Sequence, residues 1–255
     1  MELRCNPAVG AAYSSSSQVA RVVTEDWGKR NLFCAACLSD TLAQAPPNTR
    51  AFDFSCPACT ERYQLKGMRR WNDERILDSA YSAMVSAIRS DATPNLFLMH
   101  YSTEWQIHQL LLVPRFFFSE SVIEKRKPLA PTARRAGYVG CNIRIGLIPA
   151  DGKIPIIEEG KCFPASSVRE NYNRVSGLGD LASGVRGWTL AVLRCVRRLP
   201  RAFALADMYA FDKELASFHP GNRNIRPKIR QQLQVLRDLG LLRFVGTGKY
   251  ESAQA

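Results

Sequence analysis

Apolar side chains recur with helical spacing at residues 14–30 and 74–91, and this pattern predicts two amphipathic helices. Two strongly apolar runs, 95–101 and 105–113, follow and predict consecutive strands, the second apolar enough to lie in the middle of a sheet. The segment 127–142 is rich in Pro, Gly and Arg, which predicts a loop. Helices that flank strands in this order predict a mixed α/β sheet.

The pattern changes in the last third of the chain. Residues 164–187 are rich in Ser, Gly and Asn without a clear period, which predicts a linker. Apolar residues then return at helical spacing and predict three helices before a short hairpin, the helices at 187–198, 204–218 and 225–239. Three helices and a hairpin are the pattern of a winged helix-turn-helix domain. We therefore expect an α/β domain at 1–182 and a small, mainly helical domain at 183–255.

The charge of the chain is strongly positive and unevenly spread. The 255 residues carry a formal net charge of +12. An excess of this size favours an anionic partner, and nucleic acid more than membrane. Residues 183–255 hold 13 Lys and Arg against 5 Asp and Glu, whereas residues 1–182 hold 22 against 18. The C-terminal domain therefore carries most of the excess, which indicates that it contacts nucleic acid.

The predicted third helix has two different faces. Its apolar face consists of Ile229, Leu233, Leu236 and Leu239. Its other face and the hairpin tip carry the long cationic and amide side chains that bind phosphates and base edges, namely Lys228, Arg230, Gln231, Gln234, Arg237 and Lys249. The alternative is a solvated face with no partner, but the mixture of amides with arginines favours DNA binding.

A second candidate site lies on a predicted hairpin. Residues 51–54 and 62–66 predict two strands, joined by a Cys-x-x-Cys turn. Gln64 and Lys66 are two residues apart and therefore share a face, and hairpin pairing can bring Asp53 beside them. A carboxylate, a side-chain carbonyl and an ammonium on one patch suit metal-assisted hydrolysis of a phosphodiester. The alternative is an ordinary hairpin with surface charges.

Two Cys-x-x-Cys pairs surround this hairpin. They are 18 residues apart, a spacing typical of four-cysteine zinc sites, and consist of Cys34, Cys37, Cys56 and Cys59. Four thiolates close tetrahedrally on zinc and leave no open position for chemistry, so we expect a structural site that fixes the hairpin. Redox disulfides are the competing interpretation, but a chain without a secretory signal favours a reducing compartment. We expect ordinary thiols at the other cysteines, Cys5, Cys141, Cys162 and Cys195.

Nothing in the hydropathy pattern predicts a membrane segment. The N-terminus lacks the apolar core of a signal peptide. The most apolar stretch, 109–118, is short and is interrupted by Pro114 and Arg115. We therefore expect a cytoplasmic protein, a monomer in solution, whose partner is double-stranded DNA and not a membrane.

Several of these segments together carry a family resemblance that extends over nearly the whole chain. They are SQVARVVTEDW at 17–27, AFDFSCPAC at 51–59, PLAPTARRAGYVGCNI at 128–143 and KIRQQLQVLRDLGLL at 228–242. The chain resembles the DpnI-like family of methyl-directed Type II restriction endonucleases, within the PD-(D/E)xK nuclease superfamily. The resemblance implies a restriction-endonuclease-like domain with a zinc site, a C-terminal winged helix, and cleavage of GATC sites whose adenine carries an N6-methyl group. It also implies that Asp53 and position 64 bind catalytic Mg²⁺ and that Lys66 is the catalytic lysine.

The chief departure from the family pattern is Gln64, where the resemblance leads us to expect Glu. Gln keeps a carbonyl oxygen for coordination but lacks a negative charge, so metal affinity should fall. Glu61 is not an obvious substitute, because an odd offset along the strand places it on the opposite face. Glu25, on the first predicted helix, is a further candidate carboxylate.

A second departure is Tyr138, where the resemblance leads us to expect Trp. An aromatic ring beside Arg134 and Arg135 suits contact with a DNA groove or a methylated base, while the arginines bind phosphate. Because the adenine methyl group is apolar and lies in the major groove, an apolar surface must meet it. A smaller ring would loosen that discrimination. The alternative is a ring packed on the core of its own domain.

Our leading hypothesis is a methyl-directed DNA endonuclease. A rival from another class is a non-catalytic, zinc-bearing winged-helix protein that binds DNA, and Gln64 is the residue that favours it. A third hypothesis is a nuclease that acts on unmethylated or otherwise modified DNA.

Overall fold

The computed structural model describes residues 1–46, 49 and 51–253. The chain forms two compact units, each assembled from segments that are distant in the sequence. Unit 1 comprises Met1–Asn72, Thr93–Arg115 and Gly152–Arg174. Unit 2 comprises Asp73–Ala92, Phe116–Asp151 and Val175–Ala255.

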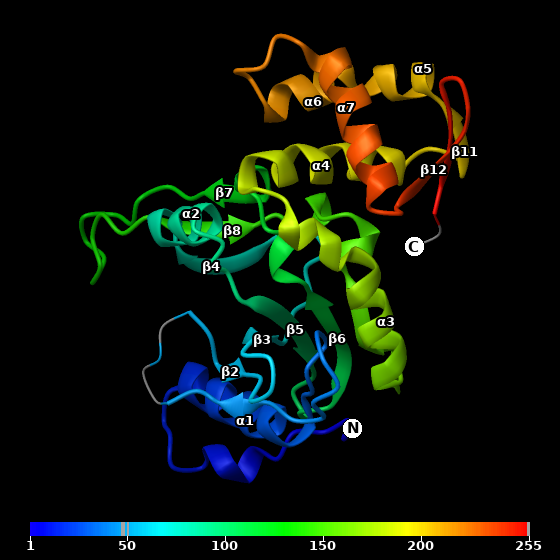
Figure 1. The fold of residues 1–255 in the computed structure, drawn as a ribbon. Coiled ribbons are helices and arrows are strands. Elements are labelled where there is room, and N and C mark those ends of the chain that lie inside the picture. Colours follow the sequence, from blue (N-terminus) through cyan, green and yellow to red (C-terminus); the bar gives the residue numbers. More distant parts are fainter. Residues whose placement is uncertain (47–48, 50, 254–255) are drawn as a thin grey trace. The chain divides into compact units, whose positions relative to one another are not determined.

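Unit 1 is built on a seven-stranded mixed sheet (Figure 1). In sheet order its strands are β1 (Ala43–Gln44), β2 (Phe54–Ser55), β3 (Arg62–Met68), β5 (Asn95–Tyr101), β6 (Ile107–Val113), β9 (Ile154–Glu158) and β10 (Lys161–Cys162). Strands β3 and β5 are parallel and all other neighbours are antiparallel. The two strands expected at 95–101 and 105–113 are present as β5 and β6, and β6 lies inside the sheet between β5 and β9, as expected.

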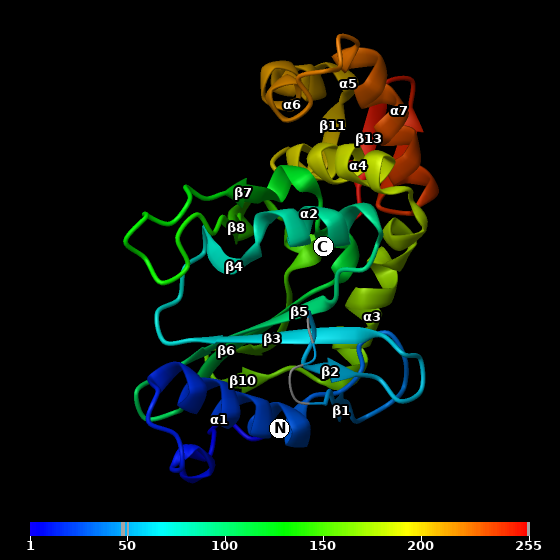
Figure 2. The same cartoon turned by 90° about the vertical axis from the view of Figure 1, so that its left-hand side faces the viewer.

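Helix α1 (Ser16–Asn31) lies along one face of this sheet (Figure 2). Its apolar stripe buries Val23 and Trp27 completely. The approach to the sheet is close at Gly28, where an added Cβ would lie 2.7 Å from the Phe54 ring. Neither α1 nor any other described helix combines the length and apolar character needed to cross a membrane.

Unit 2 contains a three-stranded antiparallel sheet in the order β4 (Ile76–Ala80), β8 (Gly140–Ile143), β7 (Ile123–Lys125). This sheet corrects two sequence expectations. The helix expected at 74–91 is a strand in its first half, and only α2 (Tyr81–Arg89) is helical. The loop expected at 127–142 ends in strand β8. Ile76 pairs with Ile143, 67 positions away in the chain, and such pairing overrides a local helical period.

The segment expected to be a linker at 164–187 is mostly helical. Helix α3 (Ala165–Val175) is followed by a 3-10 turn at Ser176–Asp180, and α4 (Ser183–Val196) begins soon after. The physical reason is an apolar stripe at Val168, Tyr172 and Val175, all buried. The many Ser, Asn and Gly residues between these positions obscure the helical period in the sequence.

The winged-helix elements of unit 2 follow the expected order. After α4 come α5 (Leu205–Met208), the 3-10 turn η7 (Tyr209–Phe211), α6 (Asp212–Phe218) and α7 (Ile225–Asp238). A three-stranded sheet completes the domain, in the order β11 (Ala202–Ala204), β13 (Lys249–Ser252), β12 (Leu242–Gly246). The single helix expected at 204–218 is therefore broken in the middle, and β11 was not expected. The predicted fold class, a mixed α/β sheet followed by a small helical domain, is confirmed.

Two arginines anchor the winged-helix domain within unit 2, one inside α4 and one directly after it. Arg186 is buried, and its guanidinium lies 2.7 Å from the Asp91 carboxylate. The residue after α4, Arg197, makes a two-point contact with buried Asp151 at 2.7 and 2.8 Å. Bidentate pairs of this kind fix geometry strongly, because both groups lose their hydration and depend on each other.

The close packing of α1 gives a testable prediction. Gly28→Ala should lower the free energy of unfolding by about 1–2 kcal/mol, because displacing the buried Phe54 ring outweighs the gain in helix propensity. Gly184→Ala is the matched control, since an added Cβ in this first turn of α4 meets nothing within 4 Å. Urea unfolding of both variants measures the difference. Equal stability of the two variants would contradict the close approach of α1.

Candidate functional site

The expected catalytic residues lie on the hairpin formed by β2 and β3. These strands pair with Phe54 opposite Tyr63, so the next position brings Asp53 across from Gln64. The backbone N–H of Asp53 donates to the Tyr63 carbonyl at 2.9 Å. The Asp53 carboxylate accepts the Leu65 N–H at 2.8 Å. The carboxylate thus continues the hydrogen bonding of the hairpin just beyond the end of β2.

Alternation along β3 separates structural side chains from chemical ones. Tyr63 and Leu65 are buried on the face that packs toward α1. Gln64 and Lys66 point to the other face and are half-buried. Burial raises the carboxyl pKa of Asp53, and the positive charge of Lys66 is close enough to oppose that rise. The structure therefore brings together the three residues that the sequence proposed.

A second carboxylate, Glu25 of α1, joins this group. Burial raises the pKa of Glu25, and the negative charge of Asp53 raises it further. Burial likewise raises the pKa of Asp53, although the Leu65 N–H and the Lys66 ammonium oppose that effect. The guanidinium of Arg21, 3.8 Å from the Glu25 carboxylate, lowers both pKa values and partly offsets this repulsion.

The surroundings of Glu25 and Glu61 decide which of them belongs to the site. Glu25 accepts a hydrogen bond from the side chain of Gln44 at 3.3 Å, and only 17% of its side chain is exposed. Glu61 instead accepts from Asn95 at 2.8 Å and lies 3.3 Å from the Arg115 guanidinium. Glu61 is thus committed to a separate polar cluster, whereas Glu25 is within electrostatic reach of Asp53.

The donor set of the hairpin fits a hard divalent cation. Asp53 offers a carboxylate oxygen and Gln64 offers an amide oxygen, and oxygen atoms of both kinds are ligands that Mg²⁺ prefers. Lys66 adds a positive charge on the same face of the sheet. Such an arrangement can hold a cation together with a phosphate group.

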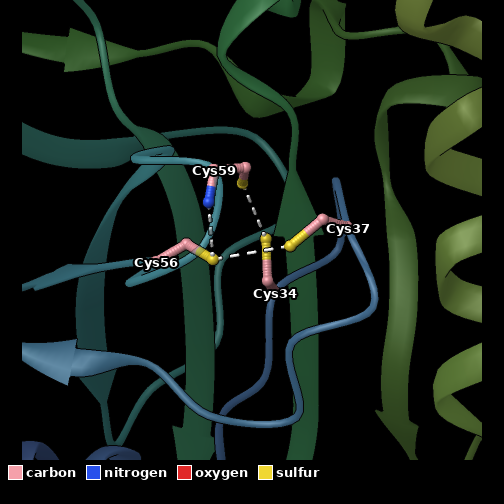
Figure 3. Close-up of side chains that lie close together, drawn as sticks. All are labelled: Cys34, Cys37, Cys56 and Cys59. Atoms are coloured by element: carbon pink, nitrogen blue, oxygen red, sulfur yellow. Dashed lines mark hydrogen bonds between the residues drawn. The ribbon is translucent and has the colours of Figure 1, made fainter.

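The four cysteines of the two Cys-x-x-Cys pairs converge at the turn of the hairpin (Figure 3). Their sulfur atoms all lie within 4.8 Å of one another. The Cys34–Cys59 and Cys37–Cys56 sulfur pairs are each 3.5 Å apart. A tetrahedral zinc site with Zn–S bonds of about 2.3 Å has sulfur separations of about 3.8 Å. The cluster can therefore hold a zinc ion, and its sulfurs are too far apart for disulfides.

Backbone N–H groups favour the thiolate form at one cysteine of this cluster, whereas burial raises the pKa of Cys34 and of Cys59. Burial alone would raise the pKa of Cys56, but hydrogen bonds from the N–H groups of Cys59 and Ala58 outweigh it and lower the pKa to about 6. The N–H of Ser39 is similarly directed at the Cys37 sulfur, at 3.5 Å. Thiolates are the form that binds zinc, so the donor chemistry fits the metal.

Two residues that the sequence did not suggest hold the cluster in place. Arg169 of α3 donates to the carbonyls of Cys34 at 3.0 Å and Ser39 at 2.9 Å. The hydroxyl of Tyr63 lies 3.1 Å from the Cys34 sulfur and accepts the Ala35 N–H at 3.1 Å. Arg169 is 135 positions from Cys34 in the chain, so no local signal could have identified it.

The other cysteines are not part of any cluster among the described residues. Cys5, Cys141 and Cys195 are buried, and Cys162 is exposed. Burial raises the pKa of the Cys5 and Cys195 thiols to about 12, which leaves them unreactive at neutral pH.

Helix α7 of unit 2 presents most of the expected DNA-binding residues to solvent. Arg230, Gln231, Gln234 and Arg237 are exposed, as is Lys249 on β13. Lys228 is half-buried, with its ammonium 2.9 Å from the side-chain oxygen of Gln231. On the other side Ile229, Leu233 and Leu236 are fully buried as expected, but Leu239 is only half-buried. Gln232 is completely buried, where its side-chain oxygen accepts from Thr189 at 2.6 Å.

The basic loop between β7 and β8 carries the remaining expected DNA contacts. Arg134 and Arg135 are exposed. The Arg135 guanidinium stacks on the ring of Tyr138, 3.9 Å from its centroid, and the ring is half-buried. Tyr138 therefore has part of its ring available to a ligand. This loop and α7 belong to unit 2, whereas the hairpin with Asp53 belongs to unit 1.

Comparison with protein-family models matches nearly the whole chain. The DpnI model, described as the Dam-replacing family, matches residues 1–180. The DpnI_C model, described as the Dam-replacing HTH domain, matches residues 184–252. These matches indicate a nuclease with a DNA-binding helix-turn-helix domain, in agreement with the hairpin chemistry and the basic face of α7. The chain belongs to the DpnI, or Dam-replacing, family.

Proposed function

We propose that this protein is a methyl-directed endonuclease that cuts double-stranded DNA at GATC sites containing N6-methyladenine. The observation that carries the proposal is the convergence of Asp53, Gln64 and Lys66 on one hairpin. The target sequence and the methyl requirement rest on the resemblance to the DpnI family. The basic surfaces of unit 2 supply the attraction for DNA.

Asp53 and Gln64 would hold Mg²⁺, which when bound neutralises charge on the scissile phosphate and lowers the pKa of a water molecule. The Leu65 N–H fixes one oxygen of the Asp53 carboxylate and so sets its orientation. Lys66, on the same face as Gln64, can orient the attacking water or stabilise charge that grows on the phosphate.

Glu25 bears on the question raised by Gln64. An amide at position 64 gives the site one negative charge less than a carboxylate would, and cation affinity depends on ligand charge. Glu25 interacts electrostatically with Asp53, so its carboxylate can supply the negative charge that Gln64 lacks. We propose Glu25 as an additional ligand or as an outer carboxylate that attracts the metal.

The proposed zinc ion is structural. Four protein ligands at Cys34, Cys37, Cys56 and Cys59 would leave no open position for chemistry. The cluster closes the hairpin turn directly beside the candidate catalytic residues. We also propose a functional boundary near residues 182 and 183, with catalysis assigned to 1–182 and DNA binding by the winged helix to 183–255.

The rival function is a non-catalytic DNA-binding protein. One observation favours it, namely that the amide of Gln64 replaces the expected carboxylate. The retained register of Asp53 and Lys66 favours catalysis instead.

A cleavage assay distinguishes these functions. In Mg²⁺ the protein should cut plasmid DNA that is adenine-methylated at GATC and leave unmethylated plasmid intact. Lys66→Ala should lower the cutting rate by at least about 100-fold while DNA binding persists, because only the reaction needs the ammonium. Lys29→Ala, which removes an equal charge from the exposed side of α1, is the control. Binding without any cutting by the parent protein would establish the rival, and equal cutting of both plasmids would remove the methyl requirement.

Substitutions at position 64 test the metal ligands. Gln64→Glu should lower the Mg²⁺ concentration for half-maximal cutting by about tenfold, because a carboxylate binds the cation more tightly than an amide. Glu25→Gln should raise that concentration. Gln18→Glu adds the same charge at the exposed start of α1 and should change nothing. If Gln64→Glu leaves the Mg²⁺ dependence unaltered, another group is the second ligand.

Metal analysis tests the cysteine cluster. The purified protein should contain one zinc per chain, and Cys56→Ser should lose it and lower the melting temperature by about 10 °C, since metal binding contributes to folding. Cys162→Ser, which alters an exposed thiol outside the cluster, should keep the metal. Zinc retained at full stoichiometry in Cys56→Ser would exclude this site.

A further inference from the structure

The wing sheet of unit 2 carries a row of aromatic rings that leads from the core to the surface. Register pairs Tyr250 of β13 with Phe203 of β11 on one side and with Phe244 of β12 on the other. The ring centroids are 5.5 Å apart for Phe203 and Tyr250 and 5.9 Å apart for Phe244 and Tyr250. Phe203 is 6% exposed and Phe244 is 53% exposed. The row thus ends in Phe244, whose ring is exposed to solvent on one side and packs against the ring of Tyr250 on the other.

The wing sheet that carries this row lies beside α7 (Figures 1 and 2), and β12 is in contact with that helix. Burial raises the pKa of Tyr250, and the positive charges of Arg237 and Arg230 on α7 counteract that rise. Arg230 also donates to the hydroxyl of Tyr209 at 3.3 Å. Helical spacing places Gln234 between the two arginines on the same stripe. The aromatic row and the expected base-reading stripe therefore stand on elements that pack against each other.

The opposite face of the wing sheet has a different character. Glu251 lies between Arg243, at 2.6 Å, and Arg201, at 2.8 Å. Alternation along β12 and β13 directs these side chains away from Phe244 and Tyr250. The charges on that face are paired with each other, which suits a solvated surface. The face beside α7, in contrast, combines the exposed ring of Phe244 with cationic and amide groups.

DNA explains this combination better than a protein partner does. Arginines and amides match phosphates and base edges, but none of the expected contact residues on α7 is apolar. Methyl groups are the apolar features of the major groove, and contact with one requires an apolar side chain. Phe244 is the exposed large apolar side chain that lies nearest in register to the aromatic and cationic cluster.

We propose that Phe244, supported by Tyr250, is the specificity-determining residue with which the winged-helix domain contacts the N6-methyl group of adenine. The proposal rests on the proposed function, because it takes methylated DNA as the substrate. It assigns methyl recognition to a residue of unit 2 that acts in addition to Tyr138 of the basic loop.

The test uses the full-length chain in the Lys66→Ala background, so that complexes are not cut. Fluorescence anisotropy gives Kd at one fixed salt concentration for GATC duplexes that are methylated, unmethylated, or methylated with uracil in place of thymine. Phe244→Ala should reduce the preference for methylated over unmethylated duplex by about fourfold, the value of one buried methyl group. Phe244→Leu should keep most of the preference. Val245→Ala, on the neighbouring residue that is 57% exposed, should keep all of it.

Each other outcome overturns the proposal in a recognisable way. Equal weakening on methylated and unmethylated duplexes would make Phe244 a general contact to DNA. Loss of the Phe244 effect on the uracil duplex would assign the contact to the thymine methyl group. An unchanged preference in Phe244→Ala would sink this inference alone, since the parent would still discriminate. A parent protein without any methyl preference would sink the methyl requirement of the proposed function as well.

Discussion

The arrangement of the candidate site depends on the pairing of β3 with a neighbour on each side. β2 holds one edge of this strand in antiparallel register and β5 holds the other in parallel register. Tyr63 and Leu65 are buried on one face, so alternation leaves Gln64 and Lys66 together on the other. The Asp53 carboxylate is hydrogen-bonded to the backbone of the same strand. A one-residue shift of β3 would exchange its faces and disperse the group.

The cysteine cluster and helix α1 stabilise that register from two directions. The hydroxyl of Tyr63 reaches the Cys34 sulfur, which links the buried face of β3 to the cluster at its turn. The close approach of α1 at Gly28 brings Glu25 within electrostatic reach of Asp53. Burial raises the pKa values of Glu25 and Asp53, because a negative charge is less well solvated when the carboxylate is partly buried. Gln64 adds no negative charge to these carboxylates, so the group has less internal repulsion than a third acidic side chain would give it.

Unit 2 shows how a small winged helix can present a basic surface without losing rigidity. The pairs Arg186–Asp91 and Arg197–Asp151 connect both ends of α4 to segments far earlier in the chain. α4 and α7 share a core in which Gln232 bonds Thr189. The buried face of α7 makes the packing contacts with the rest of the domain, so the cationic side chains on its other face can point into solvent.

The sequence by itself determined the features that depend on local spacing. Alternation placed Gln64 and Lys66 on one face, the Cys-x-x-Cys spacing identified the cluster, and helical period separated the two faces of α7. Only the tertiary structure decided that residues 76–80 are a strand, that Arg169 holds the cluster, and that Glu25 lies within electrostatic reach of Asp53. These outcomes depend on contacts between residues that are far apart in the sequence. The local pattern of apolar and polar residues does not indicate which distant segment a given residue will contact.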